Sequence, residues 1–148
     1  DFSSGKPSIN AEEAEKSRQI LIQFIDELAG KYSFDTSKVF FCGFSQGAIM
    51  SFSVGLTRPD KVRGIAAFSG RCLKEIQPLI ASSEQLSGLS AFVSHGDADG
   101  VLPVGYARES RQLLESLHVA TEYHEYKGVG HTITSENLRD FLKWLEMR

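Results

Sequence analysis

The stretch KVFFCGFSQGAIMSF, residues 38–52, places an apolar run directly before a G-x-S-x-G motif centred on Ser45. The run from Val39 to Cys42 is apolar at successive positions, which favours a strand covered on both faces, as in a parallel sheet. Residues 45–57 are then typical of a helix. Three interpretations of the turn compete: a structural tight turn that contains a serine, a phosphate-binding loop, and a serine exposed for nucleophilic attack.

Strands and helices are expected to alternate along the rest of the chain. After a loop at residues 1–9, we expect helices at 11–29, 45–57, 104–117 and 135–147, and strands at 39–42, 62–70, 89–96 and 120–128. This alternation predicts parallel βα units with right-handed crossovers. Residues 71–88 interrupt it and predict one or two short helices, a variable cap-like segment. The predicted fold class is α/β, a mostly parallel sheet flanked by helices, in one domain over residues 1–148.

The first and last helices each carry an apolar stripe at helical spacing. The two predicted buried faces are Leu21, Phe24, Ile25 and Leu28, and Leu138, Phe141, Leu142 and Leu145. Asn10 is the predicted N-cap of the first helix and Gly30 its stop signal. Thr134 or Ser135 is the predicted N-cap of the last helix.

Composition excludes several function classes. A chain of 148 residues with 41% hydrophobic residues is sufficient for one domain with a real core. Its net charge of −3 gives no electrostatic footprint for nucleic acid or an anionic membrane. No apolar stretch approaches the roughly 20 residues of a membrane span. The two cysteines, Cys42 and Cys72, are expected to be reduced thiols with Cys42 buried in its strand, which favours a cytoplasmic location.

The strand and helix around Ser45 favour the nucleophile. A nucleophile elbow needs a buried strand before the serine and a helix after it. The phosphate-loop interpretation lacks its motifs, because neither G-x-x-x-x-G-K nor G-x-G-x-x-G follows the strand. A purely structural turn would need no catalytic partners further along the chain, whereas a nucleophile needs an acid and then a histidine, in that order.

Both partners occur at the ends of later strands. Asp97 and Asp99 lie in SHGDADGVLP, residues 94–103, where the third strand ends. His131 lies in YKGVGHTITSEN, between the fourth strand and the last helix. The other histidines are interpreted as structural; they are His95, His118 and His124.

This set of residues is complete for acyl transfer without a metal or cofactor. Ser45 would attack a carbonyl carbon after giving its proton to His131, and the acid would orient the imidazole. The backbone N–H of Gln46, at the start of the helix, would donate to the developing oxyanion.

The stretches GFSQGA, HGDADGVLP and GVGH resemble the signatures of the phospholipase/carboxylesterase family of α/β-hydrolases, which includes the acyl-protein thioesterases. The resemblance implies that Ser45 is the nucleophile, Asp99 rather than Asp97 the acid, and His131 the base. One departure is Ala48, where the family usually has another glycine.

A larger departure concerns the front of the fold. Family members resemble proteins of 200 residues or more, with several strands before the first helix and an early loop that supplies a second oxyanion donor. Residues 1–37 match neither feature, and the chain offers strands on only one side of the elbow strand. We therefore expect the C-terminal portion of an α/β-hydrolase fold, with the N-terminal strands missing.

The sequence thus predicts a serine hydrolase of carboxylic esters that forms an acyl-enzyme. Its partner would be a small-molecule or lipid ester or thioester: a simple ester, a lysophospholipid or an acyl thioester. A homo-oligomer is compatible with the sequence. Peptidase or acyltransferase chemistry on the same residues, and a non-catalytic or truncated hydrolase-like binding module, are the alternatives.

Overall fold

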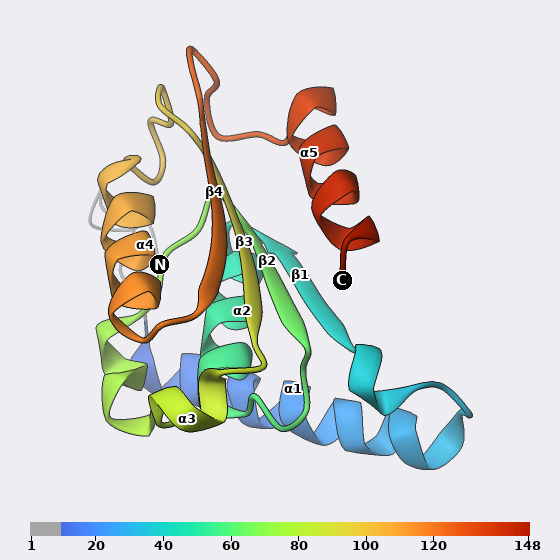
Figure 1. Ribbon diagram of the computed structural model, residues 1–148. Coiled ribbons are helices and arrows are strands. Elements are labelled where there is room, and N and C mark those ends of the chain that lie inside the picture. The colour runs from blue at the N-terminus through green and yellow to red at the C-terminus, as the bar shows by residue number, and fades with distance from the viewer. Residues whose placement is uncertain (1–9) are drawn as a thin grey trace.

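The computed structural model describes residues 10–148, and the loop predicted at residues 1–9 lies outside them. It contains a parallel sheet in the order β1-β2-β3-β4 (Figure 1). The strands are β1 (Phe40–Phe44), β2 (Gly64–Phe68), β3 (Ser90–Gly96) and β4 (Ala120–Tyr126). The alternation of strands with helices is therefore confirmed, and each parallel neighbour is reached through a crossover.

Helices cover both faces of this sheet. The longer ones are α1 (Ala11–Lys31), α2 (Gln46–Thr57), α4 (Gly105–Ser116) and α5 (Ser135–Glu146). Between β2 and β3 lie the 3₁₀ helix η2 (Lys74–Leu79) and the short α3 (Ser83–Leu86), and η1 (Thr36–Lys38) precedes β1. In Figure 1, α2 and α4 lie on one side of the sheet and α5 on the other, while α1 runs past the base of α2.

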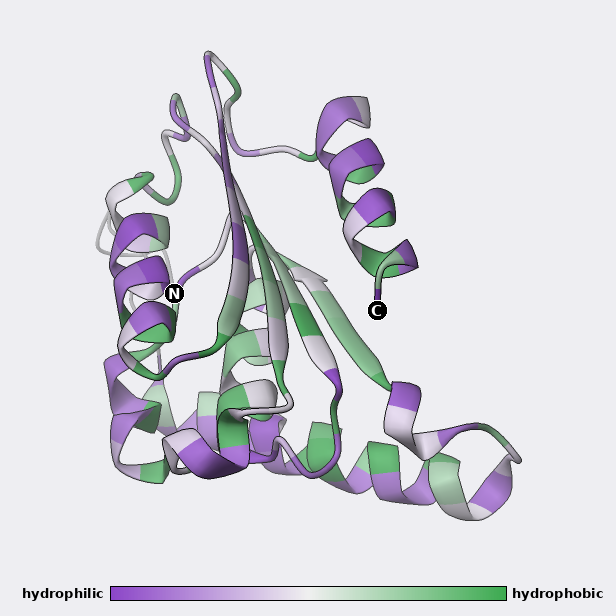
Figure 2. Ribbon diagram, viewed as in Figure 1, coloured by the Kyte–Doolittle hydropathy of each residue, from purple (hydrophilic) through white to green (hydrophobic). Residues whose placement is uncertain are grey.

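The two faces of β2 show how the core divides. Ile65 and Ala67 pack with α2 and α4, whereas Ala66 and Phe68 pack with Phe92 and Trp144 on the α5 side. Both β2 and β3 are buried along their whole length. Figure 2 shows hydrophobic residues along much of β1, β2 and α2, and mainly hydrophilic ones on β4, α4 and α5.

The prediction that the elbow strand is covered on both faces, with Cys42 buried, is wrong for this structure. β1 is the edge strand of the described sheet, and Cys42 and Phe44 are exposed. The cause is strand order: within residues 10–148, β2 is the only strand that pairs with β1, so α5 covers mainly β2 and β3. Among the described residues, the expectation that strands lie on only one side of β1 is confirmed. Cys72 is half-buried, and both thiols are free.

The apolar stripe predicted for α1 is confirmed in part, since Ile25 is buried and Leu21 packs against the same cluster. Ile22 and Ile25 are buried against Val54 and Val62, whereas Phe24 is 51% exposed. Because α1 packs on α2 rather than on the sheet, it buries only a narrow stripe. Gly30 does not end the helix either, since its φ is not positive and the helix continues to Lys31. Asn10 is the N-cap as expected, accepting from two backbone N–H groups of the first turn.

The stripe predicted for α5 is also confirmed in part, since Phe141 and Leu145 pack against the core. Leu142 is 54% exposed, while Trp144 is fully buried beside Phe92. Asn137 is buried as well, because its side chain hydrogen-bonds to β3 and to the cap of its own helix. Thr134 is the N-cap, in a capping box with Asn137.

Residues 71–88 form two short helices, as predicted. In Figure 1 they bring the chain from the carboxyl end of β2 down the α4 side of the sheet to the start of β3. Their function as a cap, and the extent of the domain, remain predictions.

Candidate active site

Ser45 lies in a strained turn between β1 and α2. Its φ of 54° falls in the left-handed region that L-residues other than glycine rarely adopt. The backbone N–H of Ser45 donates to Phe68 O at 2.9 Å, which ties the turn to β2. A Cβ at Gly43 would lie 2.1 Å from the carbonyl carbon of Gly47, so the first glycine of the motif is required by the close approach of strand and helix. At Gly47 the corresponding space is open.

The methyl group of Ala48, the departure from the family pattern, has room because residue 70, which packs against it, is a glycine. Its side chain is fully buried, and a Cβ at Gly70 would lie 2.4 Å from the Ala48 methyl group. Gly70 lies two residues beyond the end of β2, so the chain passes close to the elbow at this point.

His131 joins the serine to the acid. Its Nε2 atom lies 2.9 Å from Ser45 Oγ, and its Nδ1 atom lies 2.7 Å from Asp99 Oδ2. The imidazole also packs against the Phe44 ring, with 4.8 Å between the ring centroids. The three residues follow the carboxyl ends of β1, β3 and β4, so the parallel sheet brings them together at one edge.

The structure brings Asp99, not Asp97, to the histidine. Asp99 is buried, and its Oδ1 atom accepts from the backbone N–H groups of Val101 and Leu102 at 2.9 and 2.8 Å. Burial alone would raise the pKa of Asp99, but the hydrogen bonds from His131, Leu102 and Val101 outweigh it and hold the pKa below its usual value. Asp97 instead accepts from Gly128 N at 2.6 Å, at the start of the histidine loop.

The loop that carries His131 packs tightly on the end of β3. A Cβ at Gly96 would lie 2.1 Å from Val129 O, which itself accepts from Ala98 N at 3.0 Å. Gly128 adopts a φ of 72°, which allows the sharp turn out of β4. These contacts fix the height of His131 above the sheet.

Two supporting residues escaped the sequence reasoning. Asn137 donates from Nδ2 to Ser94 Oγ at 2.8 Å and accepts from Thr134 N at 2.7 Å, which anchors the far end of the histidine loop to β3. The available signal was the T-x-x-N spacing of a capping box. His95 is buried, with Nε2 2.7 Å from Leu102 O and 3.3 Å from Asp99 Oδ2, and no pattern in the sequence distinguished it from a core histidine.

Gln46 is the first residue of α2. The N–H groups of a helix's first turn lack intrahelical acceptors and form the positive end of its dipole. The predicted oxyanion donor therefore lies at the helix start, next to Ser45.

Within residues 10–148, no group of three or more His, Cys, Asp or Glu side chains is placed to hold a metal ion. No described helix has the length and hydrophobicity to cross a membrane.

The sequence model of the phospholipase/carboxylesterase family matches residues 1–148. The chain belongs to this family. Acyl-protein thioesterase 1 of Kluyveromyces lactis is 25% identical to this phospholipase/carboxylesterase member over 148 residues, covering 98% of the chain and 64% of the relative. The Neurospora crassa acyl-protein thioesterase 1 is 34% identical over 105 residues, covering 68% of the chain and 43% of the relative. The family member thus spans less than two thirds of these relatives.

Solved structures share the fold of this phospholipase/carboxylesterase member. Esterase PE8 superimposes with a TM-score of 0.79 and 28% identity, over 90% of this chain and 61% of its own. The carboxylesterase of Bacillus cereus gives a TM-score of 0.85 at 22% identity, over 96% of this chain and 65% of its own. The sheet described here is therefore part of an α/β-hydrolase fold.

Proposed function

We propose that this chain carries the nucleophile, acid and base of a serine hydrolase that cleaves carboxylic esters or thioesters through an acyl-enzyme. The observation that carries the proposal is the hydrogen-bonded series from Ser45 through His131 to Asp99. A merely structural turn would not explain why a serine in a left-handed conformation faces a histidine whose other nitrogen faces a buried carboxylate.

In the proposed reaction His131 acts first as base. Its Nε2 atom takes the Ser45 hydroxyl proton while Oγ bonds to the substrate's carbonyl carbon, and the carbonyl oxygen becomes an oxyanion. The Gln46 N–H donates to that oxyanion. Collapse of the tetrahedral intermediate breaks the bond to the alcohol or thiol, which leaves with the proton from His131. Water activated by the same histidine then releases the acid and restores the serine.

Asp99 acts through His131 in this scheme. Its lowered pKa keeps the carboxylate ionised at neutral pH, so it accepts the Nδ1 proton and leaves Nε2 free to accept from Ser45. Its two backbone hydrogen bonds hold the carboxylate in position.

The substrate is proposed to be a small-molecule or lipid ester or thioester. The esterases and acyl-protein thioesterases among its relatives support this class. A cytoplasmic location is proposed from the cysteine content, which comprises two free thiols.

Reaction with a fluorophosphonate, followed by intact-mass measurement, tests the proposal. We expect one adduct on the chain and none on the Ser45→Ala variant, because only a serine activated by its histidine attacks phosphorus rapidly. A folded protein without an adduct would instead favour the non-catalytic binding module. Circular dichroism of both proteins provides the control for folding.

Gly96→Ala should slow this labelling by about 10- to 100-fold, since a misplacement of about 1 Å can cost that much. The added methyl group would meet the backbone of Val129, so the loop must shift and carry His131 away from Ser45. The rate constant of labelling is the measurement. Gly100→Ala in the acid loop is the matched control, since its Cβ would meet nothing within 4 Å and it should label like the parent. Equal rates in both variants would contradict the role given to this close contact.

A further inference from the structure

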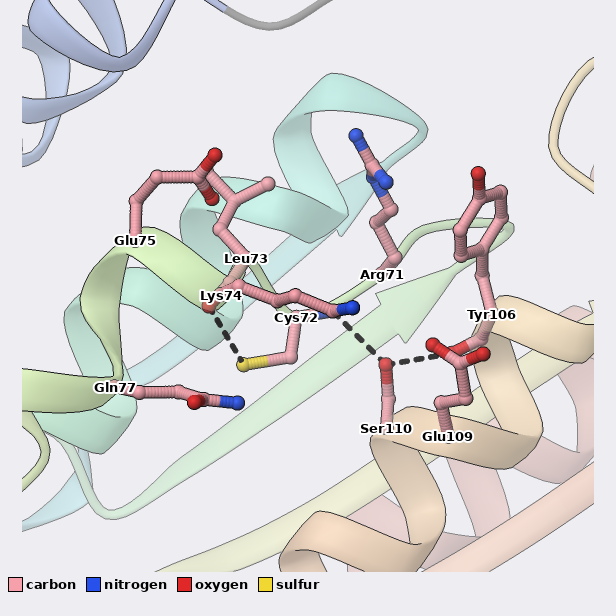
Figure 3. A pocket seen from close by; sticks show the side chains of 9 residues that line it. All are labelled: Arg71, Cys72, Leu73, Lys74, Glu75, Gln77, Tyr106, Glu109 and Ser110. Atoms are coloured by element: carbon pink, nitrogen blue, oxygen red, sulfur yellow. Dashed lines mark hydrogen bonds between the residues drawn. The ribbon is translucent and has the colours of Figure 1, made fainter.

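A pocket of about 310 Å³ opens between the segment that follows β2 and the first turns of α4 (Figure 3). Arg71 lines the pocket from the segment after β2, and Tyr106 lines it from α4. In Figure 3 their side chains extend side by side. Ser110 Oγ of α4 accepts a hydrogen bond from the backbone N–H of Cys72 at 2.9 Å, which links the segment after β2 to α4. The pocket is thus part of the packed fold rather than a gap between loose segments.

The backbone that leads into the pocket contacts the turn that carries Ser45. Phe68 O accepts from Ser45 N, and two residues later a Cβ at Gly70 would lie 3.2 Å from Ser45 O. Ser69, with a φ of 49°, turns the chain away from the sheet at this point. Arg71 is therefore the first long side chain after the stretch that touches the elbow.

Arg71 is held in place but lacks a partner for part of its charge. Its guanidinium carbon lies over the Tyr106 ring, 4.7 Å from the ring centroid, a cation–π contact that favours this position of the group. Its Nε atom is buried and has no hydrogen-bond acceptor. A buried donor of this kind is costly unless it is paired, and a guanidinium pairs best with the two oxygens of a carboxylate or phosphate.

The other charges around the pocket lie at its solvent side. Lys74, Glu75 and Glu109 are all exposed, so water and salt screen them more than the half-buried Arg71. The Cys72 thiol adds no charge, because burial raises its pKa to about 12. Among the charged side chains that line the pocket, Arg71 is therefore the only one that is not exposed.

We propose that Arg71, positioned over the Tyr106 ring, forms an anion subsite that selects esters carrying a carboxylate or phosphate group a short distance from the reacting carbonyl. The inference rests on the proposed function, which it extends to a substrate class. The anionic group could belong to the acyl part or to the leaving alcohol; both sources share the same chemistry at Arg71.

Binding is tested first, without any need for catalysis. In the Ser45→Ala protein, the Arg71 Nε–H signal is followed by ¹H–¹⁵N NMR and assigned by its loss in an Arg71→Lys variant. Monomethyl succinate and methyl phosphate should shift this signal saturably, and neutral dimethyl succinate should not. Absence of a shift with both anions, or equal shifts with the neutral ester, would overturn the subsite even if the chain proves to be an active esterase.

Kinetics then identify the source of the anion. One pair of substrates is the 4-nitrophenyl monoester of adipic acid against 4-nitrophenyl hexanoate; the other is 1-hexanoylglycerol 3-phosphate against 1-hexanoylglycerol. Arg71→Gln should raise KM for an anionic member by about tenfold or more, as the loss of a charge-assisted hydrogen bond implies, with kcat little changed. The affected pair shows whether the anion lies on the acyl part or on the alcohol.

Lys74→Gln is the matched control, because it removes an exposed positive charge from the same pocket. In each substrate pair it should leave the ratio of KM for the anionic ester to KM for the neutral ester unchanged. Equal losses on charged and neutral substrates in Arg71→Gln would contradict the subsite. If the parent chain hydrolyses none of the four esters, the proposed function fails, and the NMR titration still decides whether Arg71 binds anions.

Discussion

Replacing Ser45 with alanine should leave a folded protein whose ester hydrolysis is lower by roughly 10⁴- to 10⁶-fold. The hydroxyl group lies 2.9 Å from His131 Nε2, so its removal takes away the atom that would bond to the substrate. Little stability should be lost, because Ser45 Oγ touches the site rather than the core. The measurement is kcat/KM on 4-nitrophenyl butyrate, together with the thermal unfolding midpoint. Activity within tenfold of the parent would refute the acyl-enzyme mechanism.

Ser45→Gly provides a matched control that separates chemistry from backbone strain. Both substitutions remove the nucleophile, but only glycine adopts a φ of 54° without steric cost. The glycine variant should therefore be inactive and more stable than the alanine variant by about 1 kcal/mol. Chemical denaturation of the two variants gives this difference. Equal stabilities would mean that the turn stores no strain at Ser45.

Asp99→Asn should lower kcat by about 10⁴-fold, the effect expected when the histidine is held in the wrong tautomer. An asparagine amide can donate to Nδ1, which would place the imidazole proton on Nε2 and prevent that atom from accepting the Ser45 proton. The side chain would keep its size, so the backbone hydrogen bonds from Val101 and Leu102 to its oxygen can persist. Steady-state kinetics on the same ester and the fluorophosphonate labelling rate both report the loss.

Asp97→Asn is the control for this substitution. Asp97 contacts the backbone of Gly128 and not His131, so we expect a loss of less than about tenfold through a small shift of the histidine loop. The reverse ranking of the two variants would mean that the wrong carboxylate has been assigned as the acid. Similar losses in both would indicate that the loop, rather than the tautomer, limits the reaction.

The order of strands and helices could be predicted because it depends on local properties of the sequence. Apolar runs, helical periodicity and caps such as Asn10 and Thr134 act over a few residues, and the structure confirms them. The buried faces of α1 and α5 were predicted less well. Which side of a helix is buried depends on the element it meets: α1 meets α2 and buries Ile22, and α5 meets β3 and buries Trp144.

In the candidate site, too, local sequence patterns were predictable and long-range contacts were not. The G-x-S-x-G turn and the ends of two later strands were enough to select Ser45, Asp99 and His131, with the choice of Asp99 over Asp97 resting on family resemblance. The contacts that position these three residues could not be predicted from the sequence. Asn137 reaches Ser94 across 43 positions of the chain, and Gly96 matters because Val129 lies against it.

The set of elements, their parallel arrangement and the family of the fold were therefore predictable, because they follow from local pattern and from motifs at strand ends. The exposure of Cys42 on the edge strand β1 and the position of Arg71 over the Tyr106 ring were visible only in the tertiary structure. Each of these depends on which distant segments pack together, and packing is a property of the assembled chain.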